Sequence, residues 1–233
     1  MEFEGKNILV VGGTSGIGKS LVEKLKNADA NVINASRSKA DGVDNIPLDV
    51  TEDFQKIDDL PDQLDGLVYC PGSINLKPFQ SLKPEDYLED FNLNVVGGLN
   101  VVKASLKGLK KSKSASIIFF STVAVTQGMS FHTSVAAAKG ALEGVTRSLA
   151  AEFARQNIRV NAIAPSLTDT PMAKSLLSSD DKRKASEERH PLKRVGAADE
   201  MADAALYLLS DATAWMTGQI LHLDGGMSSI RPL

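Results

Sequence analysis

Short apolar runs alternate with helical hydrophobic patterns along the chain. Residues 8–11, 67–70 and 116–120 are apolar at nearly every position, which is typical of strands buried on both faces. Farther along, Val135, Leu142 and Leu149 recur at helical spacing. The alternation predicts an α/β protein with a single doubly wound parallel sheet and helices on both faces.

The apolar runs also define the expected elements. Residues 39–45 are too few for a normal crossover helix, so we expect a compact connection there. The helical patterns lie after residue 17, over 84–109, over 135–153 and over 198–209. The expected strands are residues 8–11, 31–35, 46–50, 67–70, 116–120 and 158–165, with a final strand and turn at 218–226.

A glycine-rich turn, residues 12–18, follows the first strand and opens a helical pattern. Its glycines are spaced Gly-x3-Gly-x-Gly, which differs from the common G-x-G-x-x-G order. A strand, a glycine turn and a helix N-terminus form an anion site, because the first helical N–H groups point at a phosphate. The turn predicts a dinucleotide site; the alternative is an ordinary glycine-rich connection. The expected contacts are Gly12, Thr14, Ser15, Gly16, Ile17 and Gly18.

Length and charge exclude several classes of function. The chain has 233 residues, a net charge of −3 and one cysteine. No long basic run supports nucleic-acid binding, and no apolar stretch approaches the ~20 residues of a membrane span. A lone cysteine and an N-terminus that leads straight into a strand favour a cytoplasmic protein. We expect one domain over residues 1–233.

The glycine turn resembles the cofactor turn of the short-chain dehydrogenase/reductase family, whose pattern is T/G-G-x-x-x-G-I-G. The letters TGQILHLDGG at residues 217–226 resemble the family's T-G-Q-x-x-x-x-D-G-G ending, and residues 159–165 resemble its R-V-N-x-I-x-P run. The resemblance covers essentially the whole chain. It implies a Rossmann fold, a nicotinamide cofactor, a small-molecule substrate, and a homodimer or homotetramer built through the long fourth and fifth helices and the C-terminal strand.

The end of the second strand indicates which cofactor is used. An acidic residue at this position would accept hydrogen bonds from the ribose 2′-hydroxyl and repel a 2′-phosphate. Here Ser36 and Arg37 stand instead. A guanidinium beside a hydroxyl suits a 2′-phosphate, so NADP(H) is favoured over NAD(H). The alternative is that Arg37 is an ordinary solvated loop residue.

Two further stretches resemble parts of the family's cofactor site. Asp49 and Val50 match a D-V pair that lies beside the adenine, although Asp49 could equally cap a helix starting near Thr51. The turn after the fourth strand keeps only Gly72 of the family's N-N-A-G, with Cys70 and Pro71 before it. Its backbone can still pass beneath the cofactor ribose.

The catalytic residues of the family are only partly kept. Asn94 matches the asparagine of N-x-x-G, which interrupts a helix and holds a water in a proton relay. Thr122 stands where the family has serine, and Lys139 matches the lysine of Y-x-x-x-K. Val135 stands where the family has tyrosine. For Asn94 and Lys139 the alternative is an ordinary helical residue facing solvent.

Val135 decides how much function the sequence supports. In the family the tyrosine phenol protonates the alkoxide that hydride transfer creates, and the lysine ammonium lowers the phenol pKa from about 10. Valine can do neither, and losing a general acid costs on the order of 10²–10⁴ in rate. Three outcomes stay open: Lys139 donates directly or through a water, His132 supplies the proton, or reduction does not occur.

The segment after the sixth strand completes the predicted site. The resemblance gives cofactor roles to Pro165, Thr168 and Thr170, with Ser166 in place of the usual glycine. Residues 171–195 are polar and mixed in charge, and we expect them to form a mobile substrate lid.

These features favour a divergent NADP(H)-dependent oxidoreductase acting on a carbonyl or alcohol, weakened or altered by the loss of tyrosine. Asn94, Thr122 and Lys139 are its expected catalytic residues. The alternative is a non-catalytic cofactor-binding homologue, either a sensor or a partner subunit. A third hypothesis is a different reaction, such as an isomerisation or elimination, with Lys139 as base.

Overall fold

The computed structural model describes residues 3–231. Its main sheet has seven strands in the order β3-β2-β1-β4-β5-β6-β9, and every neighbouring pair is parallel. This arrangement confirms the predicted doubly wound Rossmann fold. The strands are β1 (Asn7–Val11), β2 (Asn31–Ser36), β3 (Asp44–Pro47), β4 (Gly66–Tyr69), β5 (Ala115–Phe120), β6 (Ile158–Pro165) and β9 (Ile220–Leu223).

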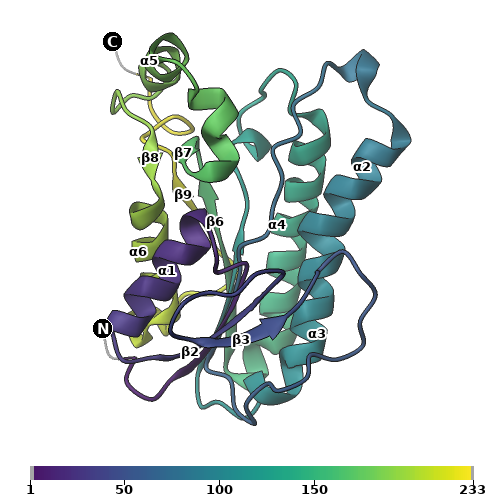
Figure 1. Ribbon diagram of the computed structural model, residues 1–233, viewed down its shortest axis with the longest axis vertical. Helices are drawn as coiled ribbons and strands as arrows, with labels where there is room; N and C mark the ends of the chain where they lie inside the picture. The colour runs from purple at the N-terminus through teal and green to yellow at the C-terminus, as the bar shows by residue number, and fades with distance from the viewer. Residues whose placement is uncertain (1–2, 232–233) are drawn as a thin grey trace.

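Helices cover both faces of the sheet (Figure 1). One face carries α1 and α6, and the other carries α2, α3 and α4. A two-stranded sheet of β7 (Thr168–Asp169) and β8 (Gly196–Ala197) lies near α5. The helices are α1 (Gly16–Asn27), α2 (Pro84–Phe91), α3 (Gly97–Leu109), α4 (Thr133–Phe153), α5 (Asp180–Glu188) and α6 (Ala198–Leu209).

The apolar strands contribute side chains to two hydrophobic cores, one on each face of the sheet, as their continuous hydrophobicity predicts. In β1, Leu9 and Val11 join the core beneath α3 and α4, while Ile8 and Val10 join the core beneath α1 and α6. Because successive side chains of a strand point to opposite faces, an all-apolar run fills both layers.

Two connections test the structure predicted from the sequence; one agrees with the prediction and the other does not. Residues 37–43, between β2 and β3, contain no helix, as expected from their number. The expected strand over 46–50 is instead Asp44–Pro47, and the helix expected to start near Thr51 is wrong, since the described residues 51–65 contain none. Asp49 instead accepts hydrogen bonds from the backbone N–H and hydroxyl of Thr51, forming a local turn.

The strand order places a crevice at one edge of the sheet. β1 is flanked by β2 on one side and β4 on the other, so the winding reverses between β1 and β4. Ligands of doubly wound sheets bind outside the carboxyl ends of the strands at such a point. Among the described residues, no helix is long and apolar enough to cross a membrane.

Candidate active site

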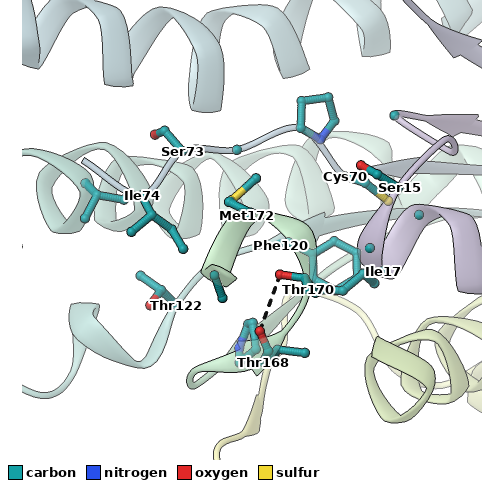
Figure 2. A pocket seen from close by; sticks show the side chains of 18 of the residues that line it. Ser15, Ile17, Cys70, Ser73, Ile74, Phe120, Thr122, Thr168, Thr170 and Met172 are labelled. Atoms are coloured by element: carbon teal, nitrogen blue, oxygen red, sulfur yellow. Dashed lines mark hydrogen bonds between the residues drawn. The ribbon is translucent and has the colours of Figure 1, made fainter. Parts of the chain in front are cut away.

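A cavity of about 570 Å³ lies along the carboxyl ends of the strands. Figure 2 shows Ser15 and Ile17 at one end, Thr122 and Ile74 at the other, and Thr170 and Met172 between them. All the residues that the sequence singled out line this cavity except Asn94, which lies just behind the wall. They are Gly12, Thr14, Ser15, Gly16, Ile17, Gly18, Ser36, Arg37, Asp49, Val50, Gly72, Thr122, Val135, Lys139, Pro165, Thr168 and Thr170.

The glycine turn is shaped to bring backbone close to a ligand. Gly12 adopts a φ of +79°, which favours glycine. A Cβ on Gly18 would lie 2.2 Å from the carbonyl oxygen of Gly12, so the turn and the first turn of α1 pack without room for a side chain. Among the described residues, Ser15 makes no side-chain cap to α1. The N–H groups at the start of α1 therefore remain available to a phosphate, and the cradle fits a dinucleotide.

A buried asparagine holds this turn, and the sequence analysis missed it. Asn34, in β2, is fully buried, and its side-chain oxygen accepts a hydrogen bond of 2.9 Å from the Gly13 N–H. Its amide group donates to the Ser36 hydroxyl and to the side chain of Asn45. Asn34 thus joins the glycine turn to the cavity wall at the end of β2. A polar residue inside an otherwise apolar strand was the signal for it.

The end of β2 presents an exposed cation at the cavity wall. Arg37 is exposed beside Ser36 and faces the cavity from the end of β2. The pKa of Asp49 is lowered mainly by its hydrogen bonds to Thr51, and Arg37 adds a smaller electrostatic contribution. The guanidinium and this carboxylate therefore lie near one another on the cavity wall.

The predicted helix interruption at Asn94 is confirmed. Residues Asn92–Val96 form a π-helical turn between α2 and α3. The Asn94 amide donates to the Asp90 carbonyl oxygen at 2.8 Å and to the Ser73 hydroxyl at 3.1 Å. Within residues 3–231 its side-chain oxygen has no hydrogen-bond partner although Asn94 is fully buried. A buried acceptor left open in this way can bind a water.

Gly72 lies between the asparagine and the lysine. A Cβ on Gly72 would lie 3.4 Å from the Asn94 side-chain oxygen and 3.5 Å from Lys139 Nζ. The two polar groups therefore approach the same point beneath the turn that follows β4. The sequence separates Asn94 and Lys139 by more than forty positions, and the fold brings them together.

Lys139 is a buried amine. It is 5% exposed, and its Nζ donates a 2.6 Å hydrogen bond to the Phe120 carbonyl oxygen at the end of β5. Burial lowers the pKa of Lys139 to about 8, against the smaller opposing influence of Cys70 and Asp90. This position excludes the ordinary solvated lysine that the sequence left open.

The ε-carbon resonance of Lys139 is expected to titrate near pH 8 in the cofactor-free protein, because burial disfavours the ammonium. Carbon-13 NMR of lysine-labelled protein measures this directly. A Lys139→Met variant identifies the signal by its loss. Titration of that signal near the ordinary lysine value would contradict the buried environment described above.

Two bonds join α4 to the end of β5. Lys139 donates to the Phe120 carbonyl oxygen, and the Ser121 hydroxyl donates to buried Glu143 at 2.8 Å. Lys139 and Glu143 are one helical turn apart, while Phe120 and Ser121 are consecutive. The pair fixes the height and rotation of α4 relative to the strand.

Val135 lies one helical turn before Lys139 on the same face of α4. It is 6% exposed and lines the cavity. Thr122 also lines the cavity, and its hydroxyl oxygen accepts a 3.3 Å hydrogen bond from the Ala124 N–H. His132 also lines the cavity, with its Nδ1 2.8 Å from the Ser130 carbonyl oxygen. The Thr122 hydroxyl and the Lys139 amine that the sequence predicts therefore line the same cavity as the apolar side chain of Val135.

The segment over residues 171–195 contains more structure than its composition indicated. Pro171–Leu177 forms a 3₁₀ helix and α5 follows it. Met172 and Arg189 line the cavity, so the segment forms one of its walls. Its mobility remains a prediction.

A serine–histidine pair stands at the edge of this segment. The Ser166 hydroxyl oxygen lies 2.7 Å from His190 Nε2, and both residues line the cavity. The sequence marked Ser166 only as a departure from glycine and gave no signal for His190, since the two are 24 positions apart.

Comparison with protein families identifies the fold's relatives. Residues 11–228 match the family model described as "Enoyl-(Acyl carrier protein) reductase". The chain belongs to the short-chain dehydrogenase/reductase family. This confirms the family that the glycine turn and the C-terminal motif predicted.

Curated relatives of this short-chain dehydrogenase/reductase are named as reductases. The chain is 33% identical over 246 residues to the 3-oxoacyl-[acyl-carrier-protein] reductase of Thermotoga maritima, covering 97% of this chain and 99% of the relative. It is 31% identical over 246 residues to a tropinone reductase homologue of Arabidopsis thaliana, covering 97% and 94%. The family members it resembles in sequence are thus oxidoreductases.

Solved structures of the same family share the whole fold. A short-chain type dehydrogenase/reductase from Mycobacterium ulcerans is 27% identical with a TM-score of 0.90, covering 98% of this chain and 91% of that one. A ligand-free aldohexose dehydrogenase from Thermoplasma acidophilum is 25% identical with a TM-score of 0.88, covering 99% and 97%.

Proposed function

We propose that the protein is an NADP(H)-dependent oxidoreductase that interconverts a carbonyl and an alcohol on a small apolar molecule. The observation that carries this proposal is a single cavity that joins the glycine turn, Arg37, Thr122 and Lys139. The cavity is also lined by several apolar side chains, which suits an apolar substrate. These include Ile74, Leu76, Met129, Met172 and Leu176.

The residues present are suited to bind a nicotinamide cofactor and to orient a substrate beside it. The glycine turn and the start of α1 would hold the pyrophosphate, and Arg37 with Ser36 a 2′-phosphate. When bound, the cofactor supplies or accepts a hydride at the substrate carbon. Lys139 would hold ribose hydroxyls, and the Thr122 hydroxyl would orient the substrate oxygen. Asp49 and Val50 would face the adenine, while Gly72, Pro165, Thr168 and Thr170 would line the nicotinamide end.

The proton for the substrate oxygen has to come from a group other than residue 135. Either the Lys139 ammonium acts through a water in the place of a phenol, or another side chain on the cavity wall supplies it. The open side-chain oxygen of Asn94 offers an acceptor for a water near Lys139.

Calorimetric titration with NADPH and, in parallel, NADH tests the cofactor part of the proposal. We expect tight binding of NADPH and much weaker binding of NADH. If neither cofactor binds, the oxidoreductase proposal is overturned, and the remaining interpretation is a Rossmann domain that serves to interact with a partner.

Arg37→Asp is expected to weaken NADPH binding by roughly 10- to 100-fold, because charge-assisted hydrogen bonds to the 2′-phosphate are replaced by repulsion. NADH binding should be retained or improved. Calorimetry on Arg37→Asp and on a Lys39→Asp control measures this; Lys39 is exposed but does not line the cavity. Equal losses in the two variants would point to a general effect of charge instead of a phosphate contact.

Turnover is tested with a panel of three carbonyl compounds, the first two chosen from the names of the relatives. The panel contains the acetoacetyl thioester of N-acetylcysteamine, tropinone and an aromatic aldehyde, each assayed with NADPH. Reduction of any member supports the proposal. A second candidate is a non-catalytic sensor or partner subunit, which the apolar residue 135 favours; it is supported if NADPH binds and no member is reduced.

The family resemblance also leads us to propose a homodimer or homotetramer. Sedimentation equilibrium measures the assembly state, and a monomer at micromolar concentration would contradict this part of the proposal.

A further inference from the structure

Ser166 follows β6 directly, at the carboxyl edge of the sheet. β5 and β6 pair in register with Phe120 opposite Ile163, and the Ser121 N–H donates to the Ile163 carbonyl oxygen. β5 ends at Phe120 and β6 ends at Pro165, and Thr122 and Ser166, just beyond these ends, line the same cavity.

The hydrogen bonds of His190 fix its tautomer. Its Nδ1 lies 2.8 Å from the Ser186 carbonyl oxygen, which can only accept, so Nδ1 carries a proton. In the neutral ring Nε2 then has a free lone pair, and the Ser166 hydroxyl donates to it across 2.7 Å, with the weaker acceptor Met227 Sδ 3.6 Å away. His190 is 2% exposed, and the turn at Gly225 packs against its side chain.

This arrangement is that of an activated hydroxyl. A hydroxyl is held by an imidazole base, and the base is oriented by a third group, here a backbone carbonyl. Ser166 is only partly buried and lines the cavity, while His190, which also lines it, is almost fully buried.

We infer that Ser166 and His190 form a proton relay that performs the task of the missing phenol. Ser166 exchanges a proton with the substrate oxygen, and His190 Nε2 exchanges a proton with Ser166. The inference rests on the carbonyl–alcohol chemistry proposed above. Ser166 is thereby a catalytic residue, and His190 acts through it.

The proton and electron balance is complete in both directions. In alcohol oxidation the C–H bond gives its hydride to the oxidised cofactor, and the electrons of the O–H bond form the C=O bond. The alcohol proton moves to Ser166 Oγ as the Ser166 proton moves to Nε2, and after the carbonyl product leaves, the imidazolium returns a proton to Ser166 Oγ, which passes one to water in the cavity. Reduction is the reverse sequence.

The competing explanation is structural, since the pair also ties the segment over 171–195 to the end of β6. The relay and the purely structural explanation predict different activities when a phenol is restored at position 135. A phenol makes the relay redundant, whereas a structural tie is needed in either background.

The test compares Ser166→Ala and His190→Asn in the parent and in a Val135→Tyr background, using the panel member reduced fastest. Asparagine places an amide N–H near the position of Nδ1 and so keeps a donor for Ser186, while it removes Nε2. We expect each variant to lower kcat by roughly 10²-fold in the parent with KM changed little, and by under about 3-fold in the Val135→Tyr background. His222→Asn, at a histidine that does not line the cavity, is the control and should leave both backgrounds unchanged.

Nitrogen-15 NMR of the histidines in the cofactor-free protein supplies a second readout. We expect the Nδ1–H tautomer for His190, and in Ser166→Ala a shift of the Nε2 resonance with Nδ1 unchanged. An Nε2–H tautomer in the parent would overturn the relay, because Ser166 would then have no base.

Other outcomes separate this inference from the proposed function. Equal losses in both backgrounds, or no loss in the parent, overturn the relay and leave the oxidoreductase proposal intact. A background-dependent loss in His132→Asn but not in Ser166→Ala assigns the proton to His132 and overturns the relay. If neither the parent nor the Val135→Tyr variant reduces any panel member, the proposed function fails and the relay with it.

Discussion

Val135→Tyr is expected to reduce carbonyl substrates faster than the parent by up to about 10²-fold, because a positioned general acid is worth on the order of 10²–10⁴ in rate and the Ser166–His190 relay already supplies roughly 10² of this. The side chain of residue 135 lines the cavity one turn before Lys139, so a phenol would enter the space where the substrate oxygen is expected. The neighbouring ammonium would lower the phenol pKa and make the proton easier to transfer. Initial rates with NADPH on the carbonyl panel measure the gain.

Val135→Phe is the matched control for this prediction. It adds the same ring without the hydroxyl, so any gain from filling space appears in both variants and a gain from acid catalysis appears only with tyrosine. A Val135→Tyr protein that binds NADPH and shows no gain would contradict the prediction and favour the sensor or partner-subunit alternative.

Gly18→Ala is expected to weaken NADPH binding by at least about 100-fold. The added Cβ would lie 2.2 Å from the Gly12 carbonyl oxygen and 3.1 Å from Gly13 Cα, so the turn has to move. Two or more backbone hydrogen bonds to the pyrophosphate are then lost, each worth about 1.5–3 kcal/mol because the acceptor is charged. Calorimetry measures the affinity, and circular dichroism shows that the variant is folded.

Gly144→Ala is the control for the glycine substitution. Gly144 lies in α4, where an added Cβ meets nothing within 4 Å. Alanine there improves helix propensity by about 1 kcal/mol and should leave NADPH binding unchanged. If the two variants bind NADPH equally well, the glycine turn is not the pyrophosphate site.

The parallel sheet was predictable because its strands bury both faces and so appear in the sequence as continuous apolar runs. β6 and α6 have the bounds that the pattern predicted. The short edge strand β3 was predicted to start two residues and to end three residues too late, since its burial is only partial and the sequence offers little contrast there. A helix start was inferred near Thr51 from residues that instead serve a local Asp49 turn.

The candidate site was predictable only where spacing along the chain carries it. Thr122 and Lys139 stand at the spacing of the family's serine and Y-x-x-x-K motif, and this resemblance is what predicted their shared cavity. The contact between Ser166 and His190 and the reach of Asn34 to Gly13 depend on long-range packing. No motif of fixed spacing links the two partners of either contact, so only the folded chain shows that they meet.

The double attachment of α4 to β5 has a consequence for how such a site can change over generations. Lys139 and Glu143 secure the helix without any contribution from residue 135. A lineage can therefore exchange the side chain at 135 while the backbone that presents it stays in place. Loss or regain of the phenol then alters reactivity with little penalty to folding, and this position becomes one at which new chemistry can be tried on an unchanged scaffold.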